Sequence, residues 1–159
     1  MSDISISLIH FEEIERLALA AGLGALLGLE RELAGKDPSL RTFALICAGS
    51  CLFTIVSTYA PEGNQYADPA RISAQIVSGI GFLGAGAIFR SRVGVQGLTT
   101  AALMWLAAAI GMAVGMGHAQ LAFEGTLVGL AVMLILKFVH RIIRYLRPNF
   151  YDDKALDFD

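Results

Sequence analysis

A glycine-rich apolar segment, Asp68–Arg90 (DPARISAQIVSGIGFLGAGAIFR), constrains the fold of this chain more than any other feature. Asp68 and Pro69 are typical of a helix start, because aspartate caps free N–H groups and proline fits the first helical position. The apolar run that follows contains Gly79, Gly81, Gly84 and Gly86. In water each glycine would cost a helix about 1 kcal/mol relative to alanine, whereas in a bilayer glycines let helices approach closely. The segment therefore predicts a transmembrane helix, packed tightly inside a bundle through these glycines.

The composition extends this prediction to the whole chain. Of 159 residues, 55% are hydrophobic and only 16% are charged, whereas soluble domains carry about 25% charged residues. Five apolar segments approach the roughly 20 residues that a bilayer core requires; they are Ile14–Leu29, Leu40–Tyr59, Ile72–Phe89, Leu98–Met116 and Ala119–Leu136. We therefore expect an all-α polytopic membrane protein, with a five-helix membrane domain at residues 1–147 and a short acidic cytosolic tail at 148–159.

Pairs of glycines four residues apart recur in three other segments, at Gly24 and Gly28, Gly111 and Gly115, and Gly125 and Gly129. One such pair is a weak signal, but its recurrence favours a close-packed bundle. Cys47 and Cys51 are also four residues apart. Since buried cysteine behaves as a small hydrophobic residue, we interpret these two as lining a helix contact.

The positions of lysine and arginine predict the orientation of the helices. The loops expected on one side carry most of them, namely Arg31, Lys36, Arg41, Arg90, Arg92, Lys137, Arg141, Arg144 and Arg147. The other side has Arg16, Arg71 and otherwise neutral or acidic loops. Because cytoplasmic loops are enriched in positive charge, we expect the N-terminus outside and the C-terminus in the cytosol.

Polar side chains at the outer end form the first candidate site. Asp68, Arg71 and Gln75 lie on one stripe of the third helix, and Glu124 lies about one turn into the fifth. Asp68 and Arg71 can pair across a helical turn, which would make them a structural cap. The functional alternative is that this stripe forms the mouth of a polar cavity. Asp68 and Glu124 would then form a carboxylate pair suited to a hard cation such as Mg²⁺, unless Glu124 only meets Arg71 or sits at headgroup level. We expect no other cofactor.

A second candidate site lies at the cytosolic end. Glu30 and Arg31 end the first helix, Arg41 begins the second and Arg90 follows the third. Thr99 and Thr100 open the fourth helix, where their hydroxyls are expected to cap free N–H groups. Capping with interfacial ion pairing is one interpretation of this group; binding of a protein or an anion is the other.

The last helix carries a basic stripe at Lys137, Arg141 and Arg144. Such a stripe is typical of a helix that contacts anionic lipid headgroups. A docking helix for a cytosolic partner is the alternative.

The sequence offers no catalytic constellation. Its three histidines are far apart, and no serine has a histidine and an acid near it in sequence. Gly79–Gly84 matches the dinucleotide-binding pattern GxGxxG, but that pattern needs a preceding strand, and here the helix has already begun. We expect neither an enzyme nor a nucleic-acid-binding protein.

Four stretches of this sequence resemble the MgtC/SapB family of bacterial inner-membrane proteins. They are GLERE at Gly28–Glu32, LRTFALICAG at Leu40–Gly49, the Asp68–Arg90 segment, and GLTTAALMWLAAAIGMAVGMG at Gly97–Gly117. The resemblance implies a multi-pass protein of the inner membrane with five spans and an outer N-terminus. It also implies a setting of magnesium limitation and stress, and in intracellular pathogens a role in survival inside macrophages. Family members in that role are thought to contact other membrane proteins, including the membrane part of the F-type ATP synthase.

Virulence-associated members of that family continue into a cytosolic domain after the fifth span, whereas this chain stops at Asp159. The virulence role is therefore not expected to carry over as it stands. The favoured hypothesis is a membrane protein that acts by association, with itself as a homo-oligomer or with a larger membrane complex, in magnesium and stress homeostasis. The alternative is a cation transporter or channel, although between Gln75 and Arg90 the only polar side chain is Ser78.

Overall fold

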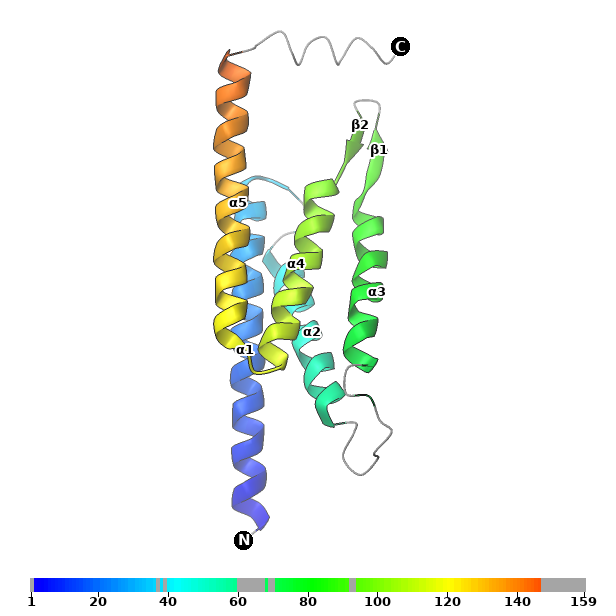
Figure 1. Cartoon of the computed structure of the whole chain (residues 1–159), viewed down its shortest axis with the longest axis vertical. Helices are drawn as coiled ribbons and strands as arrows, with labels where there is room; N and C mark the ends of the chain where they lie inside the picture. The colour runs from blue at the N-terminus through cyan, green and yellow to red at the C-terminus, as the bar shows by residue number, and fades with distance from the viewer. Residues whose placement is uncertain are drawn as a thin grey trace.

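The computed structural model of the chain describes residues 2–36, 38, 40–59, 68, 71–91 and 94–146. In order, this part of the chain forms α1 (Ser2–Leu33), α2 (Leu40–Tyr59), α3 (Arg71–Ala87), β1 (Phe89–Ser91), β2 (Gly94–Gln96), α4 (Leu98–Gly115) and α5 (Ala119–Leu146). The helices run up and down in a bundle, and α5 extends past it at its C-terminal end (Figure 1). The five expected helices are present, and the expected tail at 148–159 lies outside the described residues.

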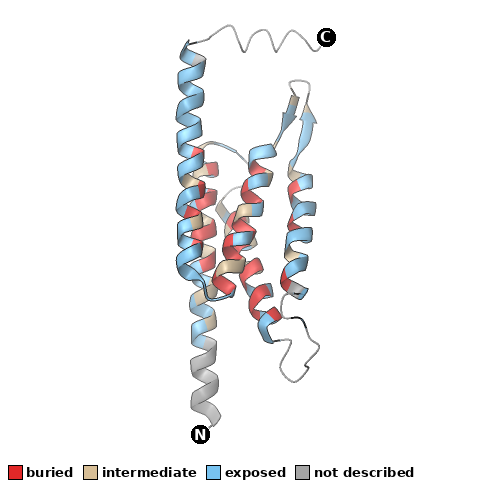
Figure 2. Ribbon diagram, in the orientation of Figure 1, coloured by how far each residue is buried: buried red, intermediate tan, exposed pale blue. Residues whose placement is uncertain are grey.

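The centre of the bundle is built from α1, α2 and α4, which carry most of the buried surface in Figure 2. The glycine pair of α1 lets α2 approach closely. A Cβ added to Gly24 would lie 2.5 Å from the carbonyl oxygen of Phe43, and one on Gly28 would lie 2.5 Å from Cα of Leu40. Since only glycine fits such a contact, the predicted role of this pair is confirmed.

The glycine pair of α4 does the same against the other face of α2. A Cβ on Gly111 would overlap the carbonyl oxygen of Cys47, and one on Gly115 would lie 2.7 Å from that of Cys51. Both cysteines are free thiols with no exposed surface. Their predicted place in a helix contact is therefore confirmed.

In contrast, α3 lies at the edge of the bundle, where it packs on α2 and α4 and exposes most of its surface (Figure 2). A Cβ on Gly79, Gly81 or Gly86 would meet nothing within 4 Å, and one on Gly84 would make an ordinary 3.5 Å contact with Ala101. The expectation that this helix is packed tightly inside the bundle is therefore wrong for the single chain. Its glycines resemble those of α1 and α4 in sequence, but Gly79, Gly81 and Gly86 are exposed, whereas Gly84 is buried.

A short β-hairpin follows α3, where the sequence had predicted continuous helix to Phe89. The helix ends at Ala87, and Phe89, Arg90 and Ser91 pair antiparallel with Gln96, Val95 and Gly94. Two glycines with positive φ allow these turns, Gly94 at 123° and Gly97 at 87°. Gly97 also passes so close to the end of α3 that a Cβ there would overlap the carbonyl oxygen of Ala87.

Length and hydropathy identify three helices of the described chain as long and apolar enough to cross a membrane. They are Leu40–Tyr59, Leu98–Gly115 and the Ala119–Ile143 part of α5. The apolar part of α3, Ser73–Ala87, is shorter, and α1 is not among the three. The chain thus has the apolar helices of a membrane protein. Three of its described helices are long enough to span a bilayer, whereas the sequence had predicted five spanning helices.

Candidate functional site

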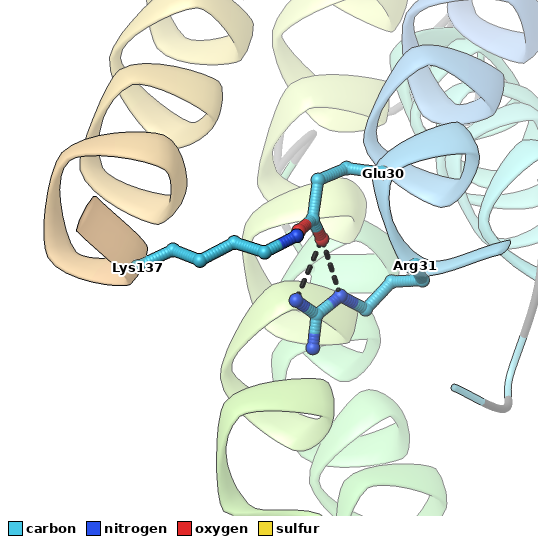
Figure 3. A network of polar contacts seen from close by, with 3 residues as sticks. All are labelled: Glu30, Arg31 and Lys137. Atoms are coloured by element: carbon cyan, nitrogen blue, oxygen red, sulfur yellow. Dashed lines mark hydrogen bonds and ion pairs between the residues drawn. The ribbon is translucent and has the colours of Figure 1, made fainter. Parts of the chain in front are cut away.

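The best-defined polar site joins the C-terminal end of α1 to α5. Arg31 donates from Nε to Oε2 of Glu30 at 2.7 Å, and its Nη2 lies 2.6 Å from the same oxygen. Lys137 reaches across from α5, with its Nζ 3.6 Å from the other carboxylate oxygen, Oε1 (Figure 3). We call these three residues the Glu30 cluster.

Two of the three charges are almost fully withdrawn from the surface. The side chain of Arg31 is 8% exposed and that of Glu30 is 10% exposed, whereas Lys137 is 52% exposed. Glu30 Oε1 is buried and accepts no hydrogen bond in the described part of the chain. Burying a charge costs several kcal/mol unless it is paired. The carboxylate and the guanidinium therefore compensate one another, and Lys137 adds a second positive charge at the open side.

The sequence placed Glu30 and Arg31 in the inner site but missed Lys137 as their partner. A signal was nevertheless present. Glu30 is the first charged residue after the apolar segment of α1, and Lys137 is the first after that of α5. Both residues mark the same boundary of the apolar layer. Aligning the ends of the two apolar segments at that boundary would therefore have placed Glu30 and Lys137 at the same level of the bundle.

The other residues of the predicted inner site do not join the cluster. Arg41, Arg90 and Thr99 are exposed, at the start of α2, in β1 and in the first turn of α4, whereas Thr100 is buried. The predicted threonine cap is wrong, because the N-cap of α4 is Gly97 and no side chain caps that helix. The hairpin connects to α4 through Gly97, whose backbone is in the left-handed conformation. Thr99 and Thr100 therefore lie within the first turn of α4 and not at its N-cap.

The outer polar residues are spread over two sides of the bundle. Arg71 and Gln75 lie exposed on α3, and none of the ion pairs between described residues includes Arg71. Glu124 lies on α5, where it accepts a hydrogen bond from Gln120 at 2.9 Å. Since α3 and α5 lie on opposite sides of α4 (Figure 1), Arg71 and Gln75 are separated from Glu124, and the pairing of Asp68 with Glu124 stays a prediction. Among the described residues there is no group of three side chains suited to hold a metal.

A groove of about 620 Å³ runs between α2 and α3. Its lining is almost wholly apolar and includes Leu45, Gly49 and Phe53 of α2 together with Ile76 and Gly79 of α3. Its polar lining residues are Thr42 and Ser50 of α2 and Gln75 of α3. The groove is large enough for apolar side chains of a neighbouring helix to enter.

Comparison with known proteins gives a consistent result. The MgtC family matches residues 17–142. The Escherichia coli K12 protein named "Putative magnesium transporter YhiD" is 42% identical over 146 residues, which cover 88% of this chain and 66% of that protein. Protein SapB of Bacillus subtilis is 39% identical over 147 residues, covering 89% and 62%. Protein MgtC of Salmonella typhimurium LT2 is 42% identical over 131 residues, covering 82% and 54%. This chain thus spans between about half and two thirds of the length of these relatives, and no solved structure matches it.

Proposed function

The chain belongs to the MgtC family, and from that premise we propose that it is a membrane protein that acts by association with itself or with another membrane protein. The association serves magnesium and stress homeostasis, and the magnesium link comes from the name of the Escherichia coli relative. In this proposal all five helices cross the bacterial inner membrane as one domain, residues 1–147. The N-terminus lies outside, and no catalysis is involved.

The observation that carries this proposal is the contrast between two sets of glycines. The glycine pairs of α1 and α4 described above are in close contact with α2, whereas a Cβ on Gly79, Gly81 or Gly86 of α3 would meet nothing within 4 Å. Helix association in a bilayer relies on small residues that let backbones approach, because apolar burial alone gives no advantage over lipid. An association surface in a bilayer therefore needs small residues that are not already covered by contacts within the chain.

One exposed face of α3, which includes Gly81 but not Gly79 or Gly86, has the spacing of a helix-packing seam. Ala74, Ser78, Gly81 and Ala85 follow one another at intervals of four, three and four residues, and all four are exposed. Such a repeat keeps one stripe of a helix facing a partner. The stripe supports the α3 face of a second copy as the partner.

Disulfide cross-linking in membranes tests this association. Ser78→Cys places a thiol on the seam, and Val128→Cys places one at a comparably exposed site on α5, where Val128 is 62% exposed. Cys47 and Cys51 have no exposed surface and are left in place. We expect an oxidant to give dimers with Ser78→Cys and few with Val128→Cys. Equal yields from both positions would argue against the α3 face.

Cation transport is the second candidate, favoured by the name of the Escherichia coli relative and by the buried carboxylate of Glu30. Its test is Mg²⁺ flux into proteoliposomes that contain correctly oriented protein. Transport predicts a flux that Glu30→Gln abolishes. Association alone predicts no flux above that of empty liposomes.

A further inference from the structure

The Glu30 cluster lies at one end of the apolar segment of α5. At 1.5 Å per residue, α5 is roughly 27 Å long from Ala119 to Lys137, which is close to the ~30 Å thickness of a bilayer core. The segment between these residues is apolar apart from its first turns, where Gln120 and Glu124 lie. Lys137 is thus the first charged side chain beyond the apolar layer.

The cluster carries an excess of positive charge. Two cations, Arg31 and Lys137, share the single carboxylate of Glu30. The next acidic residue, Glu32, is engaged elsewhere, because its Oε2 accepts a hydrogen bond from the backbone N–H of Leu40 at 3.3 Å. An anion at the cluster would balance this excess.

Lys137 also has donors to spare. An ammonium group has three N–H donors, and the 3.6 Å separation from Glu30 Oε1 is longer than a hydrogen bond. The side chain is about half exposed, so an incoming oxygen can reach it. Glu30 and Arg31 form a rigid base behind Lys137, since both are about nine-tenths buried.

Exposed apolar side chains of α5 precede Lys137 on the bilayer side. Leu134, one turn before Lys137, is 56% exposed. A free anion gains nothing from such neighbours, whereas the acyl chains of a lipid pack against them.

From these observations we propose that the Glu30 cluster is a binding site for the phosphate of an anionic phospholipid. The phosphate contacts Lys137, the buried Arg31 behind it adds a second positive charge, and the acyl chains lie along Leu134 and the adjoining surface of α5. The site is independent of the α3 seam, which lies on the other side of α4.

Native mass spectrometry of the purified protein with phosphatidylglycerol or phosphatidylcholine tests the site. Wild type is expected to retain phosphatidylglycerol selectively, and Lys137→Gln to bind it at least fivefold more weakly, which corresponds to roughly 1 kcal/mol. The matched control is Arg141→Gln, which removes the same charge one turn further along α5. Unchanged retention in Lys137→Gln, or an equal loss in both variants, would overturn the proposal, since an equal loss indicates diffuse attraction.

A second variant keeps the test informative if Lys137→Gln folds poorly. Glu30→Gln preserves the shape of the side chain and removes the only negative charge of the cluster, so phosphatidylglycerol should bind more tightly; weaker binding would contradict the site. Competition with inorganic phosphate separates the two sources of this chemistry. Displacement of the lipid only at very high phosphate supports the phospholipid, whereas displacement at low millimolar phosphate would overturn the lipid assignment in favour of a soluble anion.

Discussion

Lys137 Nζ lies 3.6 Å from Glu30 Oε1, which links the last helix of the chain to the end of the first. This contact matters because α5 is sparsely buried: only 17% of its apolar segment lies inside the bundle. Glu30 in turn is fixed by Arg31. A buried ion pair at the end of α1 thereby gives α5 a polar contact with the rest of the bundle.

Removing Arg31 should be far more damaging than removing a neighbouring surface arginine. Arg31→Met leaves the carboxylate of Glu30 buried with only the half-exposed Lys137 beside it, and breaking a buried pair in this way costs about 3–5 kcal/mol. Arg41→Met, at an exposed position, should change stability by about 0.5 kcal/mol or less. Thermal unfolding of both variants in detergent measures the difference. Similar melting temperatures would show that the pair is not needed.

Alanine at Gly111 should destabilise the protein, whereas alanine at Gly22 should not. A Cβ on Gly111 overlaps the carbonyl oxygen of Cys47, so α4 must move away from α2, at about 1–3 kcal/mol or more. A Cβ on Gly22 meets nothing within 4 Å, and there the better helix propensity of alanine contributes up to about 1 kcal/mol. The two variants should shift the unfolding temperature in opposite directions. A shift of the same sign in both would contradict the close α2–α4 contact.

Gly97→Ala should be the most disruptive of the loop glycine substitutions. Gly97 combines a φ of 87° with a position where a Cβ would overlap the carbonyl oxygen of Ala87. Gly35 is the matched control, because its φ of 64° imposes a strain of about 1–2 kcal/mol on alanine but leaves open space around it. Folded yield after membrane extraction compares the two. If both variants give the same yield, the close approach at Gly97 is not a constraint.

The sequence predicted the helices and their close packing because both depend on local pattern. Long apolar segments between polar breaks predict helices, and the pairs Gly24–Gly28 and Gly111–Gly115 lie in helix contacts as expected. The β-hairpin was missed because it needs only three residues on each side of a turn, and the apolar run continues through Phe89 without a break.

The position of α3 could not be predicted, because a glycine that faces a neighbouring helix and one that faces outward look alike in sequence. Gly111 and Gly81 differ only in what the fold places opposite them. The same limit applies to Lys137, whose pairing with Glu30 depends on α5 packing beside α1. Which helices are neighbours is a property of the whole bundle.

The central claim is that the outward-facing seam of α3 mediates association, and subunit counting tests it most directly. Wild type, Gly81→Leu and the matched variant Gly22→Leu would be reconstituted in lipid and counted by single-molecule photobleaching. Both glycines have open space around them in the single chain, so neither leucine should impair folding. We predict an oligomer for wild type and Gly22→Leu, and monomers for Gly81→Leu. An unchanged oligomer in Gly81→Leu, or a monomeric wild type, would contradict the account.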